Sequence, residues 1–320
     1  QAEQMGAETI RGEIVSIEDD NGLYRIVLSK GNRIESRSVI LAPGCQPRQL
    51  GIPGEKEFLG KGVSYCATCD AELYEEATVV IVGSGDTAVE EANYISRYAD
   101  RVLMVVVHDE GTLDCNKTMA EEAFANPKLV WLWNHSLSSI QGDEIVNGVT
   151  LKDLKKGTEE HIECDGVFMF VGIIPQTAFL KGFVNLERGY ITANDRMETE
   201  KPLVYAAGDA RVKTLRQVVT AASDGAIAAF YADKALSELD GYSRAMEGTN
   251  GECLLYFYTP PVQRSLELFP IVEKKAEDLK IPLRKFDIYR YKNTAARFGI
   301  KEVPALIHLK DEKKLREIKL

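Results

Sequence analysis

The sequence lacks a run of about 18 apolar residues, the length that a membrane-spanning helix needs, so such a span is excluded. Positive charge is also scarce, because 39 Lys and Arg face 49 Asp and Glu, for a formal net charge of −10 and a pI near 5.1. Nucleic acid and anionic membranes both require a positive field, so this acidic chain is a poor candidate for binding either. Tandem repeats and low-complexity tracts are absent as well.

The rest of the composition is that of an ordinary folded protein. Hydrophobic residues make up 45% and charged residues 28%, which is too apolar for disorder. A length of 320 residues predicts two or three domains. The first residue is Gln1 rather than Met, so we expect a fragment in which any upstream signal peptide would be missing.

The cysteines are too scattered for a disulfide framework, and the histidines do not supply the missing ligands of a zinc site. Of the six cysteines only Cys66 and Cys69 are close in sequence, and the four histidines provide no second pair with zinc-site spacing. We therefore expect no metal and favour a redox dithiol, with half of a zinc site as the alternative. In a redox role Asp70 would give or take a proton during thiol exchange, whereas its structural alternative is a helix cap.

The middle of the chain carries a complete β-α-β pattern. The β-branched run Thr78–Val82 and the apolar run Arg101–Val107 predict buried parallel strands with a helix between them. Gly83, Gly85 and Ala88 follow the first strand with the spacing of a dinucleotide-binding fingerprint. The first glycine permits the tight turn, the second lets the backbone approach a pyrophosphate, and the alanine keeps helix and strand close. A turn without a ligand is the alternative.

Acidic residues stand where the second of these strands ends. A carboxylate roughly 20–25 positions after the glycines can accept a hydrogen bond from a ribose 2′-hydroxyl, and Asp109 and Glu110 occupy that place. Together with Asp114 they would repel the 2′-phosphate of NADP, which favours NAD. The alternative is a solvated acidic loop.

Further elements flank this unit. Strands are expected over 10–17 and 23–28, and Leu203–Ala207 is a strand that enters a Gly-Asp pair, a second candidate phosphate or ribose site. A long Ala-rich helix is expected over 217–236, and the polar segment 240–251 predicts a linker.

Several motifs occur together in one order. Cys-Ala-Thr-Cys-Asp at 66–70 precedes the Gly-x-Gly-x-x-Ala unit, and Ala-Gly-Asp at 207–209 and Arg-Gln-Val at 216–218 follow it. In this order residues 7–240 resemble the low-molecular-weight thioredoxin reductases, flavoproteins with one FAD domain and one pyridine-nucleotide domain. The strand and turn at 40–44 resemble the segment that closes the first part of that FAD domain.

The resemblance implies an α/β fold with two Rossmann-like, three-layer dinucleotide-binding domains. It assigns 1–48 and 186–240 to an FAD domain, and 49–185 to a pyridine-nucleotide domain that carries the redox pair. The family's first Gly-x-Gly-x-x-Gly fingerprint, which would stand upstream of Gln1, is absent from the sequence, so we expect an N-terminally truncated chain with an incomplete FAD domain. Hinge strands are expected over 50–62 and near 181–189.

The resemblance also implies roles for individual residues. Cys69 would face the flavin, Cys66 would attack the partner's disulfide, and Asp70 would be the acid–base group. Arg216 and Gln217 would lie near the isoalloxazine ring. The residues implied in FAD binding are Gly44, Gly208, Asp209, Arg216 and Gln217. Those implied in nicotinamide dinucleotide binding are Gly83, Gly85, Ala88, Asp109 and Glu110.

The residues after the second strand of the β-α-β unit bear on the electron donor. The NADP-dependent form of the family carries His-Arg-Arg where this chain has His108, Asp109 and Glu110, so NADH is favoured over NADPH and ferredoxin stays open. The resemblance implies a thioredoxin or thioredoxin-like protein disulfide as partner, a homodimer, and a cytoplasmic location.

Residues 247–320 resemble a thioredoxin fold. Phe298–Pro304 is similar to the segment that leads to that fold's cis-proline, but Val262 and Ser265 replace the two cysteines of its WCxxC motif. Such a domain cannot cycle a disulfide, so we expect a docking or structural role, with Pro304 in a substrate-like groove. A degenerate fusion without function is the alternative.

The leading hypothesis is a flavin-dependent thioredoxin-disulfide reductase-like oxidoreductase. Electrons would pass from a reduced donor through FAD to Cys66 and Cys69, and from there to a protein disulfide. One alternative is a redox-inactive binding or scaffold protein that uses its thioredoxin-like domain. The other is a related flavoenzyme that is fed by ferredoxin or acts on a peroxidase partner.

Overall fold

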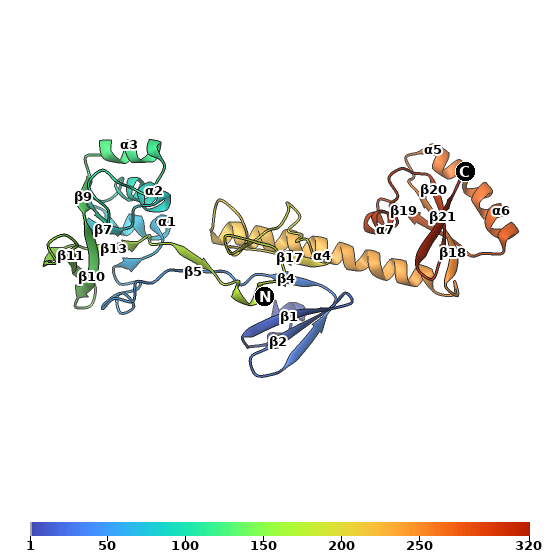
Figure 1. The fold of residues 1–320 in the computed structure, drawn as a ribbon, viewed down its shortest axis with the longest axis horizontal. Helices are drawn as coiled ribbons and strands as arrows, with labels where there is room; N and C mark the ends of the chain where they lie inside the picture. Colours follow the sequence, from blue (N-terminus) through green and yellow to red (C-terminus); the bar gives the residue numbers. More distant parts are fainter. Residues whose placement is uncertain (1) are drawn as a thin grey trace. The chain divides into compact units, whose positions relative to one another are not determined.

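The computed structural model describes residues 2–320, and its contacts divide the chain into two compact units (Figure 1). One unit is Cys45–Pro175, and the other combines the chain up to Gly44 with Gln176–Leu320. The division falls at 44/45 and 175/176, where the sequence predicted 48/49 and 185/186. Residues 181–189, expected to form a hinge, lie inside the second of these units rather than at a boundary.

The unit Cys45–Pro175 is built on a five-stranded parallel sheet in the order β6-β13-β7-β8-β9. Its strands are β6 (Val63–Ser64), β13 (Gly166–Met169), β7 (Thr78–Val82), β8 (Arg101–Val106) and β9 (Leu129–Trp133). Alternate residues of each strand enter different hydrophobic clusters, so the sheet is buried on both faces, as the β-branched run predicted.

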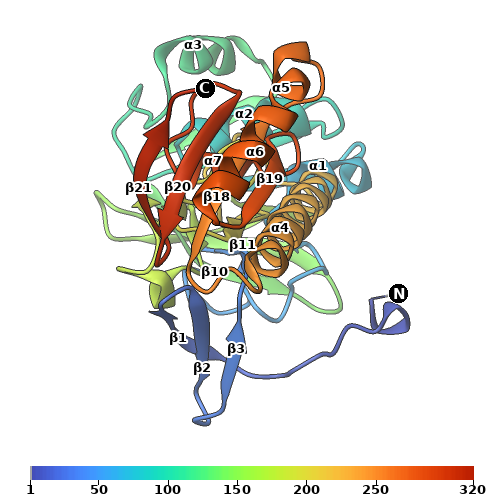
Figure 2. The same ribbon diagram turned by 90° about the vertical axis from the view of Figure 1, so that its right-hand side faces the viewer.

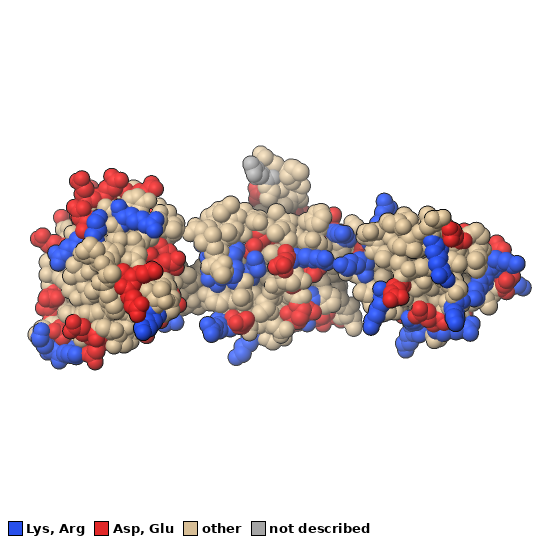
Figure 3. Space-filling view, turned by 90° about the horizontal axis from the view of Figure 1, so that it is seen from above, with Lys and Arg blue, Asp and Glu red and all other residues tan. Residues whose placement is uncertain are grey.

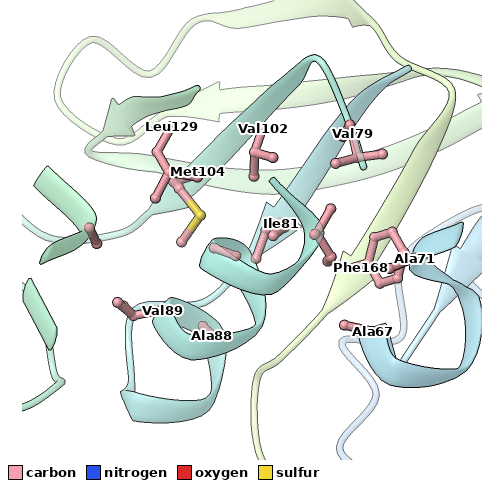
Figure 4. Packing of buried hydrophobic residues seen from close by; sticks show 14 of the residues in the cluster. Ala67, Ala71, Val79, Ile81, Ala88, Val89, Val102, Met104, Leu129 and Phe168 are labelled. Atoms are coloured by element: carbon pink, nitrogen blue, oxygen red, sulfur yellow. The ribbon is translucent and has the colours of Figure 1, made fainter. Parts of the chain in front are cut away.

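Helices cover one face of this sheet. They are α1 (Ala67–Asp70), the 3-10 helix η2 (Ala71–Tyr74), α2 (Asp86–Ile95) and α3 (Lys117–Ala125). Figure 4 shows Ala88 and Val89 of α2 packed near Ile81, with Ala67 of α1 alongside. The short side chains of Ala67 and Ala88 allow α1 and α2 to approach each other closely, which places the Cys-x-x-Cys pair beside the dinucleotide-type helix.

A second, antiparallel sheet covers the opposite face. Its strands are β10 (His135–Gly142), β11 (Val146–Asp153) and β12 (Glu159–Glu163), in that order. Apolar side chains of β10 and β11, among them Leu137, Val149 and Leu151, join the cluster on this face. A short antiparallel pair, β5 (Cys45–Pro47) and β14 (Ile173–Pro175), stands where the chain enters and leaves the unit. The expected three-layer arrangement is therefore present.

The other unit begins with the meander β1 (Ile14–Asp20), β2 (Leu23–Leu28) and β3 (Arg33–Ser36). A tight turn joins the first two strands at Asn21 and Gly22, whose φ angles are 54° and 87°. β4 (Val39–Leu41) pairs in parallel with β17 (Val204–Ala206). Its remaining short elements are η1 (Glu3–Met5), η3 (Ala178–Leu180), β15 (Leu186–Glu187) and β16 (Tyr190–Ile191).

The long helix α4 (Val218–Met246) corrects the predicted linker over 240–251. Ala228 and Ala232 of α4 pack with the β17 segment, whereas Tyr242 belongs to the core formed with the C-terminal sheet. The polar composition suggested a linker, but burying the Tyr242 ring stabilises the helix ten residues beyond its expected end. Neither α4 nor any other helix of residues 2–320 is long and apolar enough to cross a membrane.

The C-terminal elements form the expected thioredoxin-like α/β arrangement. They are β18 (Glu252–Tyr258), α5 (Gln263–Glu267), α6 (Phe269–Leu279), β19 (Leu283–Asp287), α7 (Lys292–Arg297), β20 (Ala305–Lys310) and β21 (Lys313–Ile318). The sheet order is β19-β18-β20-β21, and Figure 2 shows β20 and β21 side by side. The expected cis-proline is confirmed, because the peptide bond between Val303 and Pro304 is cis.

Candidate redox and dinucleotide site

Cys66 and Cys69 are joined in a disulfide, and their Cα atoms lie 5.3 Å apart. Cys66 stands at the N-cap of α1, and one helical turn brings Cys69 back to it. Ala67, only 1% exposed, anchors this turn in the core, while Cys69 is exposed to solvent. The predicted redox pair is therefore formed and accessible, and its sulfurs are not in the thiolate form that binds zinc.

Asp70 is held beside the disulfide by a residue that the sequence did not single out. Oγ of Ser64 donates to a carboxylate oxygen of Asp70 at 2.6 Å and accepts the backbone N–H of Cys66 at 3.1 Å. Ser64 lies in β6 and is only 5% exposed, so it fixes the Asp70 carboxylate relative to the Cys66 peptide. The side chain of Asp70 makes no helix-cap hydrogen bond, which removes its structural alternative.

Three of the other cysteines, Cys115, Cys164 and Cys253, are poor nucleophiles because burial raises the pKa of their thiols. Burial raises the pKa of Cys164 to about 12 and that of Cys253 to about 11. Burial also raises the pKa of Cys115. Because the thiolate is the reactive form, these three side chains stay inert thiols near neutral pH. Residues 2–320 contain no group of three or more His, Cys, Asp or Glu arranged to hold a metal ion.

The predicted dinucleotide turn has the geometry that the fingerprint requires. Gly83 has φ of 140°, and an added Cβ would lie 2.4 Å from the carbonyl oxygen of Phe170, so only glycine fits. Gly85 is the N-cap of α2, and no atom lies within 4 Å of where its Cβ would be. Ala88 is fully buried where the helix meets the strand. The turn therefore leaves open the backbone approach that a pyrophosphate needs.

The acidic residues after β8 do not share one environment. Asp109 pairs with Nζ of Lys155 at 2.5 Å, and this hydrogen bond lowers the pKa of Asp109. Glu110 is exposed. Asp114, by contrast, reaches the glycine turn, because its carboxylate accepts a hydrogen bond from Oγ of Ser84 at 2.7 Å. This hydrogen bond lowers the pKa of Asp114. The structure thus separates Asp109 from Asp114, and neither Lys155 nor Ser84 was apparent in the sequence.

One unexpected acid lies on α2. Oε2 of Glu91 is buried without a hydrogen-bond partner. Burial, reinforced by the neighbouring Glu90, raises the pKa of Glu91. A carboxyl group in this setting favours its protonated form. No signal in the sequence distinguishes Glu91 from Glu90, because the two look alike until the packing of α2 partly buries one of them.

The predicted FAD residues lie in the other unit. Gly208 has φ of 76°, which only glycine adopts readily, and its N–H donates to Asp224 at 3.1 Å. Burial would raise the pKa of Asp224, but hydrogen bonds from Arg211 and Lys213 outweigh it and lower the pKa to about 2. Asp224 therefore stays charged and fixes the turn that carries Asp209.

The start of α4 presents the remaining predicted FAD residues. Nε of Arg216 donates to the Asp209 carbonyl oxygen at 3.1 Å, and its guanidinium lies over the Tyr190 ring, 4.4 Å from the centroid. Gln217 caps the helix. Val218, the first residue of α4, is 86% exposed, so an apolar surface lies open beside Arg216 and Gln217. This arrangement suits a planar apolar ring with a polar edge.

Gly44 completes the predicted set. Its φ is 72°, and no atom lies within 4 Å of the position of an added Cβ. The residues present thus fit an FAD group in one unit, through Gly44 and the turn at Gly208, and a dinucleotide in the other, through Gly83 and Gly85. Gly83, Gly85 and Ala88 lie together at the start of α2, whereas Asp109 pairs with Lys155 and Glu110 is exposed.

Residues 2–225 match the family described as pyridine nucleotide-disulphide oxidoreductase. The chain belongs to this family. It is 46% identical over 241 residues to a thioredoxin reductase of Peptoclostridium acidaminophilum, covering 73% of this chain and 76% of the relative. A thioredoxin reductase of Treponema pallidum is 42% identical over 229 residues, covering 72% and 74%. The solved thioredoxin reductase of Streptococcus pyogenes has a TM-score of 0.70 at 36% identity and covers 73% of this chain and 76% of that one.

These similarities confirm the predicted class. The protein is an FAD-dependent disulfide oxidoreductase of the thioredoxin reductase type, with the predicted Rossmann-like fold. Membership of the family implies FAD and a nicotinamide dinucleotide as cofactors. The alternative of a redox-inactive scaffold is not favoured, because the disulfide and the dinucleotide turn are both formed.

Proposed function

We propose that Cys66 and Cys69 carry electrons from the flavin to a disulfide of a thioredoxin-type protein, with NADH as the donor. The observation that carries this proposal is the exposed Cys66–Cys69 disulfide, with Asp70 fixed beside it by Ser64. The relatives are thioredoxin reductases by name, which supports a thioredoxin-type partner.

Each cofactor has a set of residues that would hold it. FAD would be bound by Gly44, Gly208, Asp209, Arg216 and Gln217. The nicotinamide dinucleotide would be bound by Gly83, Gly85 and Ala88, with Asp109 or Glu110 near the ribose. When bound, the flavin supplies the two electrons that reduce the disulfide to a dithiol.

The protein's own residues then perform thiol exchange. The Cys66 thiolate attacks one sulfur of the partner's disulfide, forming a mixed disulfide and releasing the partner's second sulfur as a thiolate, which takes up a proton. The Cys69 thiolate attacks the Cys66 sulfur, which re-forms the Cys66–Cys69 bond and releases the partner's other thiol. Asp70 gives and takes the protons of these two steps.

The domain assignment and the assembly remain proposals. We assign residues up to 48 and 186–240 to the FAD domain, 49–185 to the dinucleotide domain and 247–320 to a docking domain that lacks redox cysteines. Burial of Tyr242 of α4 among C-terminal core residues supports a docking domain fixed to that helix. A homodimer and a cytoplasmic location stay predictions.

NADH is expected to bleach the flavin roughly tenfold faster than NADPH in anaerobic mixing, because Asp109 and Glu110 repel a 2′-phosphate. The variant Asp109→Arg with Glu110→Arg should reverse the preference, since Lys155 would lose its partner and three cations would face the ribose. Stopped-flow absorbance of the flavin measures both rates.

The matched control reverses two exposed acids of the β10–β11 turn, Asp143→Arg with Glu144→Arg. It makes the same change in net charge and should keep the NADH preference. Faster bleaching of the unmodified protein by NADPH would refute the interpretation of Asp109 and Glu110. Bleaching by reduced ferredoxin alone would refute NADH as the donor.

A further inference from the structure

The segment that carries the disulfide has no basic side chain. Between Lys61 and Arg97 the sequence contains neither Lys nor Arg. The acids in the same stretch are Asp70, Glu72, Glu75, Glu76, Asp86, Glu90 and Glu91. The whole unit Cys45–Pro175 carries 22 Asp and Glu against 10 Lys and Arg, and Figure 3 shows acidic side chains, with basic ones among them, spread over the body at the left of the view.

Buried and exposed residues follow a helical spacing through α1 and η2, and the two residues after η2 are exposed. The buried residues are Ala67, Ala71 and Tyr74, which pack into the core. The exposed residues are Thr68, Cys69, Glu72, Leu73, Glu75 and Glu76. The disulfide therefore opens onto the same surface as three carboxylates, and we call the set Glu72, Glu75 and Glu76 the acidic rim.

The rim has an apolar centre and no internal charge partner. Leu73 is 79% exposed between Glu72 and the other two acids. No ion pair among residues 2–320 joins a rim carboxylate to a Lys, Arg or His side chain, and all three rim residues are exposed to solvent. Uncompensated charges act over about 8–10 Å at moderate ionic strength, which spans the approach to Cys69.

We propose that the acidic rim is the docking surface for a protein whose disulfide is surrounded by Lys and Arg side chains. This rests on the proposed function of Cys66 and Cys69, because a partner must bring its own disulfide to theirs and so cannot avoid the rim. An acidic partner would meet like charges at the moment of exchange, whereas a basic partner would be attracted and oriented. Leu73 gives such a partner an apolar contact beside the reacting sulfurs.

The test uses the full chain, reduced with dithiothreitol, desalted and mixed with oxidised Cys-x-x-Cys peptides in single turnover. Two peptides share one sequence around the disulfide, and are flanked by four lysines in one and four glutamates in the other. We expect the lysine peptide to be reduced roughly tenfold faster at low salt, and the two rates to converge as salt is added.

Charge reversal of the rim supplies the decisive variant. Glu72→Lys, Glu75→Lys and Glu76→Lys together should invert the peptide preference. A matched control makes the same change in net charge on α3 and the β10–β11 turn, through Glu122→Lys, Asp143→Lys and Glu144→Lys. This control should keep the preference for the lysine peptide. Uncharged hydroxyethyl disulfide should react equally with all three proteins, which checks that the dithiol is intact.

The outcomes separate the two levels of the proposal. Equal rates for the two peptides, with normal reduction of hydroxyethyl disulfide, would overturn the docking surface alone. An unchanged preference in the rim variant would do the same. Failure to reduce any of the disulfides would overturn the proposed function of Cys66 and Cys69, and with it the docking proposal. Because this exchange needs no flavin, the donor experiments do not affect it.

Discussion

A Cys66→Ser variant is expected to lose reduction of a protein disulfide by about a thousandfold or more, while its flavin is still reduced at the normal rate. A serine hydroxyl cannot form the mixed disulfide, and the thiols of Cys164 and Cys253 cannot replace Cys66, because burial raises their pKa to about 12 and about 11. Steady-state turnover with oxidised thioredoxin and stopped-flow flavin absorbance measure the two steps separately.

Cys69→Ser is the matched variant that tests which sulfur attacks. It should also lose turnover, but it should trap the partner as a stable mixed disulfide on Cys66, visible as a mass shift that a reductant removes. Cys69 is the more exposed of the two cysteines, so this variant distinguishes the attacking sulfur from the resolving one. Trapping by Cys66→Ser instead would exchange the two roles, and normal turnover in either variant would refute the exchange mechanism.

Gly83→Ala is expected to lower the free energy of unfolding of the dinucleotide unit by about 1–3 kcal/mol or more and to abolish dinucleotide binding. The φ of 140° is strained for any side chain, and the new Cβ would lie 2.4 Å from the Phe170 carbonyl oxygen. Relief of that contact must move the strand end against Ala88 and so distort the turn. Urea unfolding and NADH titration measure the two effects.

Gly85→Ala is the control that separates binding from folding. Its φ of −83° suits alanine and its Cβ would meet no atom within 4 Å, so stability should change little. The methyl group would nevertheless occupy the space through which a pyrophosphate approaches the backbone, so affinity for NADH should fall roughly tenfold. Unchanged affinity in Gly85→Ala would show that the dinucleotide does not use this turn.

The elements that could be predicted best from the sequence are those whose structure depends on local residues rather than on distant contacts. The run Thr78–Val82 is a strand with the predicted bounds, because β-branched side chains favour a strand buried on both faces. The end of α4 could not be predicted in this way. Residues 240–246 are polar enough for a linker, and they are helical because Tyr242 packs against Phe286 and Phe298, which lie more than 40 positions away.

The candidate site shows the same division. The spacing of Cys66 and Cys69 and of Gly83 and Gly85 reflects local geometry, so the disulfide and the tight turn could be anticipated. The groups that hold them could not. Ser64 reaches Asp70 only through the bend between β6 and α1, and Lys155 reaches Asp109 from a distant turn.

The most direct test of this account is to count the thiols that appear when the full chain, loaded with FAD, is reduced anaerobically by NADH. After alkylation and mass spectrometry, Cys66 and Cys69 should both be labelled once the flavin has been bleached, and neither should be labelled before NADH is added. A bleached flavin with Cys66 and Cys69 still joined would contradict the claim that this disulfide carries the electrons onward.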